Sequence, residues 1–206
     1  MTEWAWSLLF STFLLSSFLA ANHAFARGLP FHLTRKIAHL VAVVPVALAP
    51  VVFTSVWFPL GLSSVFLVLL VAAHNVDLFP GVVRKGRWSE VFFPLSLILS
   101  LSLWPFSPWL AVLPGIFLSL GDGAAGIVRS LLYRRPTKGL WGSAACLGVC
   151  LPFSVLAEPL WIGAVGATAF TVAEFLCGDV GCIKADDNLA APVSAAAVMG
   201  VAYALL

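Results

Sequence analysis

The residues best suited to chemistry in this sequence gather in one stretch, 119–143, around an isolated carboxylate. Asp122 ends an apolar run and stands between Gly121 and Gly123. A carboxylate costs roughly 2.5–3.5 kcal/mol at the centre of a membrane-spanning helix, so an acid beside an apolar run indicates a functional role. Four cations follow it within the same stretch: Arg129, Arg134, Arg135 and Lys138.

An acid beside several cations is the combination that a metal–triphosphate group requires. Mg²⁺ is typically held by one or two carboxylates together with phosphate oxygens, and Arg and Lys neutralise the remaining phosphate charge. Gly121 and Gly123 would let a ligand or another backbone come close to Asp122. The pattern G-x-G-x-x-G through Gly126 is not a dinucleotide fingerprint, because an apolar helix and not a strand precedes it.

Three other polar segments carry candidate residues. Arg35 and His39, with Lys36 between them, are four positions apart and share one face of a helix. Glu90 opens an apolar run, where the helix dipole favours an acid. Asp187 and Asn188 precede the last apolar run, and either could cap a helix there. Taken singly, these residues are adequately explained as membrane anchors and helix caps.

The elements that would position these residues are membrane helices. The 206-residue chain is 61% hydrophobic and 10% charged, whereas soluble domains are about 25% charged. We predict an all-α, polytopic bundle of about eight transmembrane helices, within a range of seven to nine, forming a single membrane-embedded domain over 1–206. A membrane span needs about 20 apolar residues, and the predicted segments are 4–25, 37–54, 57–78, 91–104, 109–131, 143–157, 160–176 and 189–206.

The first 26 residues have two interpretations. Ala24-Phe25-Ala26 resembles a signal-peptidase site. However, no Lys or Arg precedes the apolar run, Glu3 lies before it, and the run is long for a signal peptide. We therefore predict a first transmembrane helix in this region.

The positions of the basic residues predict the orientation of the bundle. All eleven Lys and Arg residues fall in alternate connections, at 27–36, 84–87, 129–138 and 184. Cytoplasmic loops of membrane proteins carry the excess of Lys and Arg. Both termini are therefore expected on the non-cytoplasmic side, and every candidate residue is expected near the cytoplasmic face.

Four motifs occur in order along the chain: RKIAH at 35–39, EVFFP at 90–94, GDGAAG at 121–126 with TKGLWGS at 137–143, and DDNLAAP at 186–192. Together they resemble the polyprenol kinase family, which includes dolichol kinase, phytol kinase and the CTP-dependent diacylglycerol kinase. That family is related to phosphatidate cytidylyltransferase. The resemblance covers about 33–195. Three departures are present: Trp141 stands where the family motif K-S-x-E-G-S has glutamate, Arg129 and Leu132 or their neighbours replace glycines, and Ser89 replaces the glycine before Glu90.

The resemblance implies a multi-helix enzyme that transfers the γ-phosphoryl group of CTP to a membrane lipid alcohol, assisted by Mg²⁺ or another divalent cation. The alcohol would be polyprenol or dolichol, phytol or geranylgeraniol, or diacylglycerol. The positions that match the family are Arg35, Lys36, His39, Glu90, Asp122, Lys138, Gly142, Ser143, Asp187 and Asn188. To these we add Gly121, Gly123, Arg134 and Arg135 as neighbours of the nucleotide phosphates.

The working hypothesis gives these residues three roles. Asp122, Asp187 and Asn188 would hold the metal ion on the triphosphate. Lys138 and an arginine from the 134–135 pair would clamp the phosphates. Glu90 or Asp187 would accept the proton of the lipid hydroxyl, and the sequence leaves the choice between them open.

Two other functions are compatible with parts of the sequence. A cytidylyltransferase would use the same nucleotide but attack its α-phosphorus, releasing pyrophosphate and forming a CDP-lipid. A small transporter would need charged residues along a path to the outer face, and the predicted outer halves contain only Glu3 and Glu158. The expected partners are CTP, a lipid alcohol and membrane lipids; nucleic-acid binding has no support, because the basic residues serve as topology signals.

Overall fold

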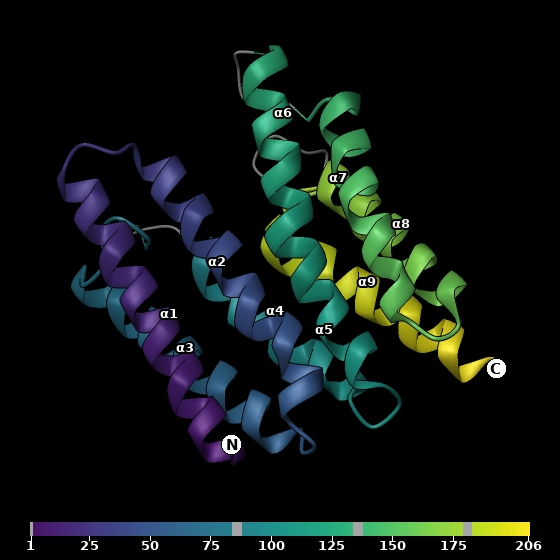
Figure 1. Ribbon diagram of the computed structural model, residues 1–206. Coiled ribbons are helices and arrows are strands. Elements are labelled where there is room, and N and C mark those ends of the chain that lie inside the picture. Colours follow the sequence, from purple (N-terminus) through teal and green to yellow (C-terminus); the bar gives the residue numbers. More distant parts are fainter. Residues whose placement is uncertain (1, 84–87, 134–137, 179–182) are drawn as a thin grey trace.

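The computed structural model describes residues 2–83, 88–133, 138–178 and 183–206. Within them the chain is all-helical, which confirms the predicted fold class; the β-pairing there is one isolated bridge between Cys177 and Ile183. The α-helices, shown in Figure 1, are α1 Glu3–Ala26, α2 Phe31–Val52, α3 Trp57–Val76, α4 Ser89–Ser100, α5 Pro108–Phe117, α6 Gly123–Tyr133, α7 Leu140–Phe153, α8 Leu160–Leu176 and α9 Asp187–Ala204.

Every predicted apolar segment is helical, but two boundaries matter for the site. Helix α2 begins at Phe31, after Pro30, six residues before the predicted start. Arg35, Lys36 and His39 therefore all lie on this helix. Helix α9 is capped by Asp186, whose side chain accepts a hydrogen bond from the backbone N–H of Asn188 at 3.0 Å. The predicted caps, Asp187 and Asn188, are instead the first two helical residues.

Four helices are long and apolar enough to cross a membrane. They are Glu3–Ala26, Phe31–Val52, Trp57–Val76 and Pro108–Tyr133. Three further apolar helices, Ser89–Leu103, Leu140–Leu156 and Leu160–Leu176, are shorter than the roughly 20 residues that cross a 30 Å hydrocarbon core. The described chain thus has membrane-protein character.

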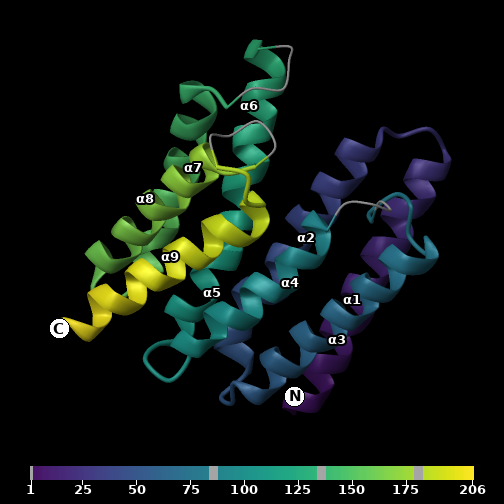
Figure 2. The same cartoon turned by 180° about the vertical axis from the view of Figure 1, so that it is seen from behind.

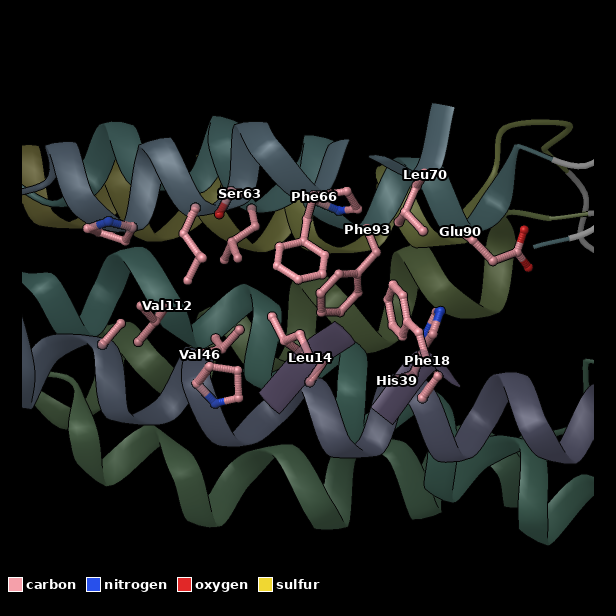
Figure 3. Close-up of a pocket in the computed structure, with 18 of the residues that line it drawn as sticks. Leu14, Phe18, His39, Val46, Ser63, Phe66, Leu70, Glu90, Phe93 and Val112 are labelled. Atoms are coloured by element: carbon pink, nitrogen blue, oxygen red, sulfur yellow. The ribbon is translucent and has the colours of Figure 1, made fainter. Parts of the chain in front are cut away.

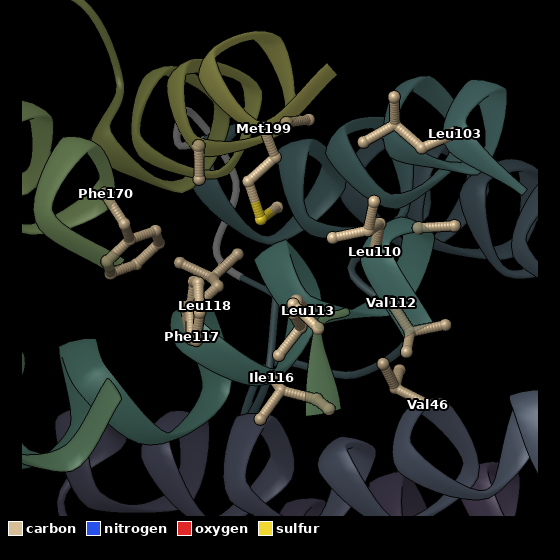
Figure 4. Close-up of a cluster of buried hydrophobic side chains, with 14 of the residues drawn as sticks. Val46, Leu103, Leu110, Val112, Leu113, Ile116, Phe117, Leu118, Phe170 and Met199 are labelled. Atoms are coloured by element: carbon tan, nitrogen blue, oxygen red, sulfur yellow. The ribbon is translucent and has the colours of Figure 1, made fainter. Parts of the chain in front are cut away.

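Helix α5 lies between two groups of helices, with α1–α4 on one side and α6–α9 on the other (Figures 1 and 2). It is the most deeply buried helix, with Leu110, Leu113, Ile116 and Phe117 fully enclosed. Figure 4 shows these side chains packed among Val46 and other residues of neighbouring helices. A second cluster of buried side chains lies between α1, α2 and α3.

The predicted span 109–131 contains an irregular turn at the candidate acid. The chain passes from α5 into a π-helical turn, Leu118–Asp122, and then into α6. Such turns are rare and frequently lie at functional sites. The turn packs tightly against α7, because a Cβ atom on Gly121 would lie 2.6 Å from the Cys150 sulfur. Asp122 comes directly after Gly121 and is the last residue of this turn.

Candidate functional site

A large polar cavity, of about 830 Å³, lies at the end of the bundle where α2, α4 and α9 begin. It brings together segments that are far apart in the sequence. Six of the predicted site residues line it: Arg35, Lys36, His39, Asp122, Lys138 and Asp187. They come from α2, the π-helical turn, the segment before α7 and the start of α9, so the cavity depends on the folded bundle.

Several lining residues were not assigned to the site from the sequence. They are His32, Trp88, Ser89, Gly126, Arg129, Lys184 and Asp186, together with the smaller or apolar residues Phe31, Phe92, Gly178 and Ala185. Within the described residues, the wall carries five cationic side chains and three carboxylates. A concave surface with an excess of one charge attracts ligands of the opposite charge, so this wall favours a polyanion.

Glu174, near the end of α8, organises the cations on one side of the polar cavity. Its carboxylate accepts two hydrogen bonds from Arg129, each 2.7 Å long, in a bidentate arrangement. The Lys138 ammonium donates to the same carboxylate, to the Glu174 carbonyl and to the Asp187 carboxylate, at 2.7 Å each. The Glu174 side chain is only 1% exposed. This network joins α6, the α7 entrance, α8 and α9.

The charge balance of the network keeps Lys138 protonated. Burial alone would lower the pKa of Lys138, but the carboxylates of Glu174 and Asp187 outweigh it and hold that pKa above its ordinary value. Lys138 therefore stays cationic at neutral pH while it lines the polar cavity.

Gly142 provides space for this network. A Cβ atom at Gly142, on α7, would collide with the Arg129 side chain, and its distance to Arg129 Cγ would be 2.8 Å. The sequence predicted Gly142 as a neighbour of the nucleotide phosphates, which stays a prediction; the structure places it beside the Arg129 side chain. Close packing of a small residue explains why this position carries no side chain.

Replacing Gly142 by alanine is expected to displace Arg129 and lower the free energy of unfolding by about 1–3 kcal/mol, as overpacking does. The matched control is Gly148→Ala on the same helix, where an added Cβ meets nothing within 4 Å. That change should be neutral or slightly stabilising, since glycine costs helices about 0.5–1 kcal/mol. Denaturant titration in detergent micelles measures both; equal stabilities would contradict the packing role of Gly142.

A second network ties the start of α4 to the start of α9. The Asn188 amide donates to the Ser89 carbonyl at 3.0 Å, and the Ser89 hydroxyl donates to Asp186. Burial raises the pKa of Asp186, despite the hydrogen bond from Ser89. Asn188 is buried in this contact and does not line the polar cavity. Asn188 joins the starts of α4 and α9, and its role as a metal ligand stays a prediction.

Arg35 and Glu90 form an ion pair beside the polar cavity, with 3.0 Å between Arg35 Nε and Glu90 Oε1. Glu90 lies in the first turn of α4 and is 2% exposed. A carboxylate so deeply buried requires such a partner. Arg35 lines the polar cavity, whereas Glu90 lines a separate apolar cavity next to it.

Lys36 belongs to α2, and its side chain extends to α6. Its ammonium group donates to the Asp122 carbonyl at 3.4 Å and fills the space beside Gly126, where any Cβ atom would collide with it. Among the ion pairs of the described residues, none involves Lys36. Its charge is therefore not neutralised by a salt bridge, unlike that of Arg129 or Lys138.

The remaining predicted residues lie elsewhere. Gly121 faces the α7 cysteines, a Cβ on Gly123 would meet nothing within 4 Å, and neither residue lines the polar cavity. The Ser143 hydroxyl is buried with no hydrogen-bond partner among the described residues. Arg134 and Arg135, predicted to contact phosphates, lie outside the described residues.

The donor set fits a metal ion only in company with a polyanion. In the described part of the chain, no three His, Cys, Asp or Glu side chains lie together as a metal site would require. Two carboxylates, Asp122 and Asp187, do line the same cavity. Mg²⁺ commonly uses one or two carboxylates and takes its other ligands from phosphates and water, so this pair is compatible with a metal–nucleotide complex.

No family model, curated protein or solved structure matches this chain. The resemblance to the polyprenol kinases therefore rests on the four sequence motifs. The geometry brings residues of all four motifs to adjoining cavities: Arg35, Glu90, Asp122 and Asp187. The function is accordingly inferred from the motifs and this geometry together.

Proposed function

We propose that this protein is a CTP-dependent kinase that phosphorylates the hydroxyl of a membrane lipid alcohol. In this proposal the chain crosses the membrane about eight times, both termini lie outside, and the polar cavity opens to the cytoplasm. The observation that carries the proposal is the pairing of a cationic, carboxylate-bearing cavity with an apolar cavity, joined at His39. A reaction between a water-soluble polyanion and a lipid requires both.

The polar cavity supports a nucleotide as the water-soluble partner. Its volume of about 830 Å³ lies within the range of roughly 300–1,000 Å³ that small-molecule sites occupy. Lys36, Lys138 and Arg129 lie on its wall, and Lys36, which no salt bridge of the described residues neutralises, would pair with the phosphates. Phosphoryl transfer depends mainly on positioning and on stabilising charge, and the salt-bridge network fixes Lys138 and Arg129 before the ligand arrives.

Asp122 and Asp187 are the residues that would hold Mg²⁺ here. Mg²⁺ held there would supply positive charge that stabilises the negative charge of the transferred group. The protein positions the two carboxylates through its fold and its salt bridges. Asp122 is set by the π-helical turn, and Asp187 is held through Oδ2 by Lys138 at 2.7 Å.

The position of Glu90 favours it over Asp187 as the proton acceptor. Both carboxylates are in ion pairs, Asp187 with Lys138 and Glu90 with Arg35, but Glu90 also borders the apolar cavity from which a lipid hydroxyl would approach. In this mechanism Glu90 accepts the hydroxyl proton while the oxygen attacks the γ-phosphorus of CTP. The bond to the β-phosphate oxygen breaks, and CDP leaves from the polar cavity.

The test is a product assay with the full-length protein purified in detergent micelles. CTP labelled on the γ-phosphate, with Mg²⁺, is incubated with geranylgeraniol, phytol, a long polyprenol or diacylglycerol. We expect labelled lipid phosphate and CDP in equal amounts. Phosphatidate is assayed in parallel, because a CDP-lipid forms from a lipid phosphate and not from an alcohol. A CDP-lipid with pyrophosphate in that assay would identify a cytidylyltransferase instead, and the absence of nucleotide turnover with every alcohol and with phosphatidate would contradict both enzymes.

A further inference from the structure

The polar cavity has aromatic lining residues to which the mechanism above gives no role. Trp88 directly precedes α4, and Phe92, four positions later, lines the cavity from the same side of that helix. Phe31 and His32 line it from the start of α2. Phe93, the residue after Phe92, belongs to the apolar cavity instead (Figure 3). The polar cavity therefore offers flat apolar surface as well as charge.

The Trp88 ring is covered by another ring on one face. Its centroid lies 4.2 Å from that of the His74 ring, with 34° between the two planes, so the rings lie face against face. His74 is buried near the end of α3 and backs the tryptophan from within the bundle. Trp88 is nevertheless 45% exposed and lines the polar cavity. The ring face turned away from His74 is therefore open to a ligand.

Two of the cations that line the polar cavity come from a different part of the fold. Arg129 lies on α6 and Lys138 just before α7, and Glu174 ties both to α8. Helix α4, which Trp88 precedes, packs against α3, α5 and α9. A ligand that contacts both groups must carry an anionic group at one end and a flat ring at the other. A nucleotide has this construction.

The start of α9 presents one carboxylate to each of these two groups. Asp187 pairs with Lys138, whereas Asp186 accepts a hydrogen bond from the hydroxyl of Ser89, the residue after Trp88. The Asp186 side chain also lines the polar cavity. Its two oxygens accept one bond each from Ser89 and from a backbone N–H of α9 within the described residues. A carboxylate has about four acceptor sites, so Asp186 can accept a further hydrogen bond from a ligand.

We propose that Trp88 and Asp186 form the nucleobase subsite of the polar cavity. The base stacks on the open face of Trp88, and its exocyclic amino group donates to the Asp186 carboxylate. The inference rests on the proposed function and adds the two residues that bind and select the base. Cytosine and adenine have such an amino group, whereas uracil, like thymine, has an acceptor oxygen at that position. The subsite therefore selects bases that carry an amino group.

The stacking contact is tested by comparing CTP with inorganic tripolyphosphate, which has three phosphates and no base. Binding to the full-length protein is measured by calorimetry in micelles, with Mg²⁺ and without lipid alcohol. Trp88→Ala should weaken CTP binding about tenfold, as the loss of a stacked aromatic ring does, and leave tripolyphosphate binding unchanged. Trp88→Phe should retain most of the CTP affinity. The matched control is Trp57→Ala, which removes an exposed ring at the other end of α3 and should change neither affinity.

The contact to the amino group is tested by comparing CTP with UTP in the same assay. The wild type should bind CTP about tenfold more tightly than UTP, as one matched polar contact to a base allows. Asp186→Asn should remove this preference, because the asparagine amide can donate to the uracil oxygen. Asparagine and aspartate are equally good helix caps, so α9 should keep its start. Equal affinities of the wild type for CTP and UTP would remove Asp186 from the subsite.

The stacking site is overturned if Trp88→Ala weakens CTP and tripolyphosphate binding equally, or weakens neither. Should Trp88→Ala or Asp186→Asn lose its monodisperse gel-filtration profile, 5-iodo-CTP is photo-cross-linked to the wild type. Labelling of the peptide that contains Trp88 supports the proposal, and labelling confined to other peptides overturns it.

Binding and turnover distinguish this inference from the proposed function. CTP binding that depends on Trp88, without phosphate transfer to any alcohol, keeps the base subsite and removes the kinase. CTP-dependent phosphorylation with the same KM for CTP in the wild type, Trp88→Ala and Asp186→Asn keeps the kinase and removes the base subsite.

Discussion

Replacing Glu174 by glutamine is expected to lower the free energy of unfolding by about 3 kcal/mol. Removing one partner of a buried ion pair costs roughly 3–5 kcal/mol, because the other charge remains buried without compensation. Arg129 loses its carboxylate partner, and Lys138 keeps only that of Asp187. We place the effect at the low end of the range because these side chains are 12% and 11% exposed, and water reaches them in part.

The matched control for Glu174→Gln is Glu158→Gln, which removes an exposed carboxylate from the connection before α8. Exposed charges contribute little to stability, so this variant should unfold like the wild type. Denaturant titration followed by circular dichroism in micelles gives both free energies. Equal losses in the two variants would show that Glu174 does not hold the network together.

Replacing Asp122 by asparagine is expected to lower kcat for CTP-dependent phosphorylation by about 10²–10³-fold, the usual effect of removing one positioned electrostatic group. Asparagine keeps the size of the side chain and removes its charge, which would weaken the hold on Mg²⁺. Asp122 forms no salt bridge among those of the described residues. The fold should therefore tolerate the change, and the unfolding free energy should stay close to that of the wild type.

Asp77→Asn provides the same chemical change away from the polar cavity. Asp77 is exposed at the end of α3, where its backbone has a left-handed conformation with φ of 57°, and asparagine adopts that conformation readily. Its kinetics should match the wild type. Unchanged turnover in Asp122→Asn, measured with saturating CTP and varied Mg²⁺, would remove Asp122 from the metal site.

The sequence predicted the parts of the site that are unusual for a membrane chain. Asp122 was identified because a charged residue beside an apolar segment is costly, and Lys138 and Asp187 were assigned through the motifs that carry the resemblance. Their meeting in one cavity agrees with that expectation. The helices were predictable for a related reason, since long apolar runs without charges have few alternatives to a buried helix.

What the sequence could not reveal was which charges pair. Glu174 is 45 residues from Arg129 and 36 from Lys138, and no local spacing links residues so far apart. Gly142 illustrates the same difficulty. A small residue indicates a close approach, but only the packed helices identify the approaching group as the Arg129 side chain.

Trp141 stands where the motif of the family that the chain resembles has a glutamate. Trp141 is 67% exposed, so a carboxylate here would point away from the packed network. Lys138 receives its carboxylates from Glu174 and Asp187, on α8 and α9. In this chain, two other helices supply the charge that neutralises Lys138.

The π-helical turn inside the continuous helix Pro108–Tyr133 rotates the side chains that follow it about the helix axis, relative to those that precede it. Successive residues of an α-helix are about 100° apart around the axis, and a π turn inserts one residue into that sequence. The buried apolar face of α5 and the cavity-lining residues Asp122, Gly126 and Arg129 therefore point in directions that an uninterrupted α-helix would not give them. One extra residue lets a core helix and a cavity-lining helix share a single axis.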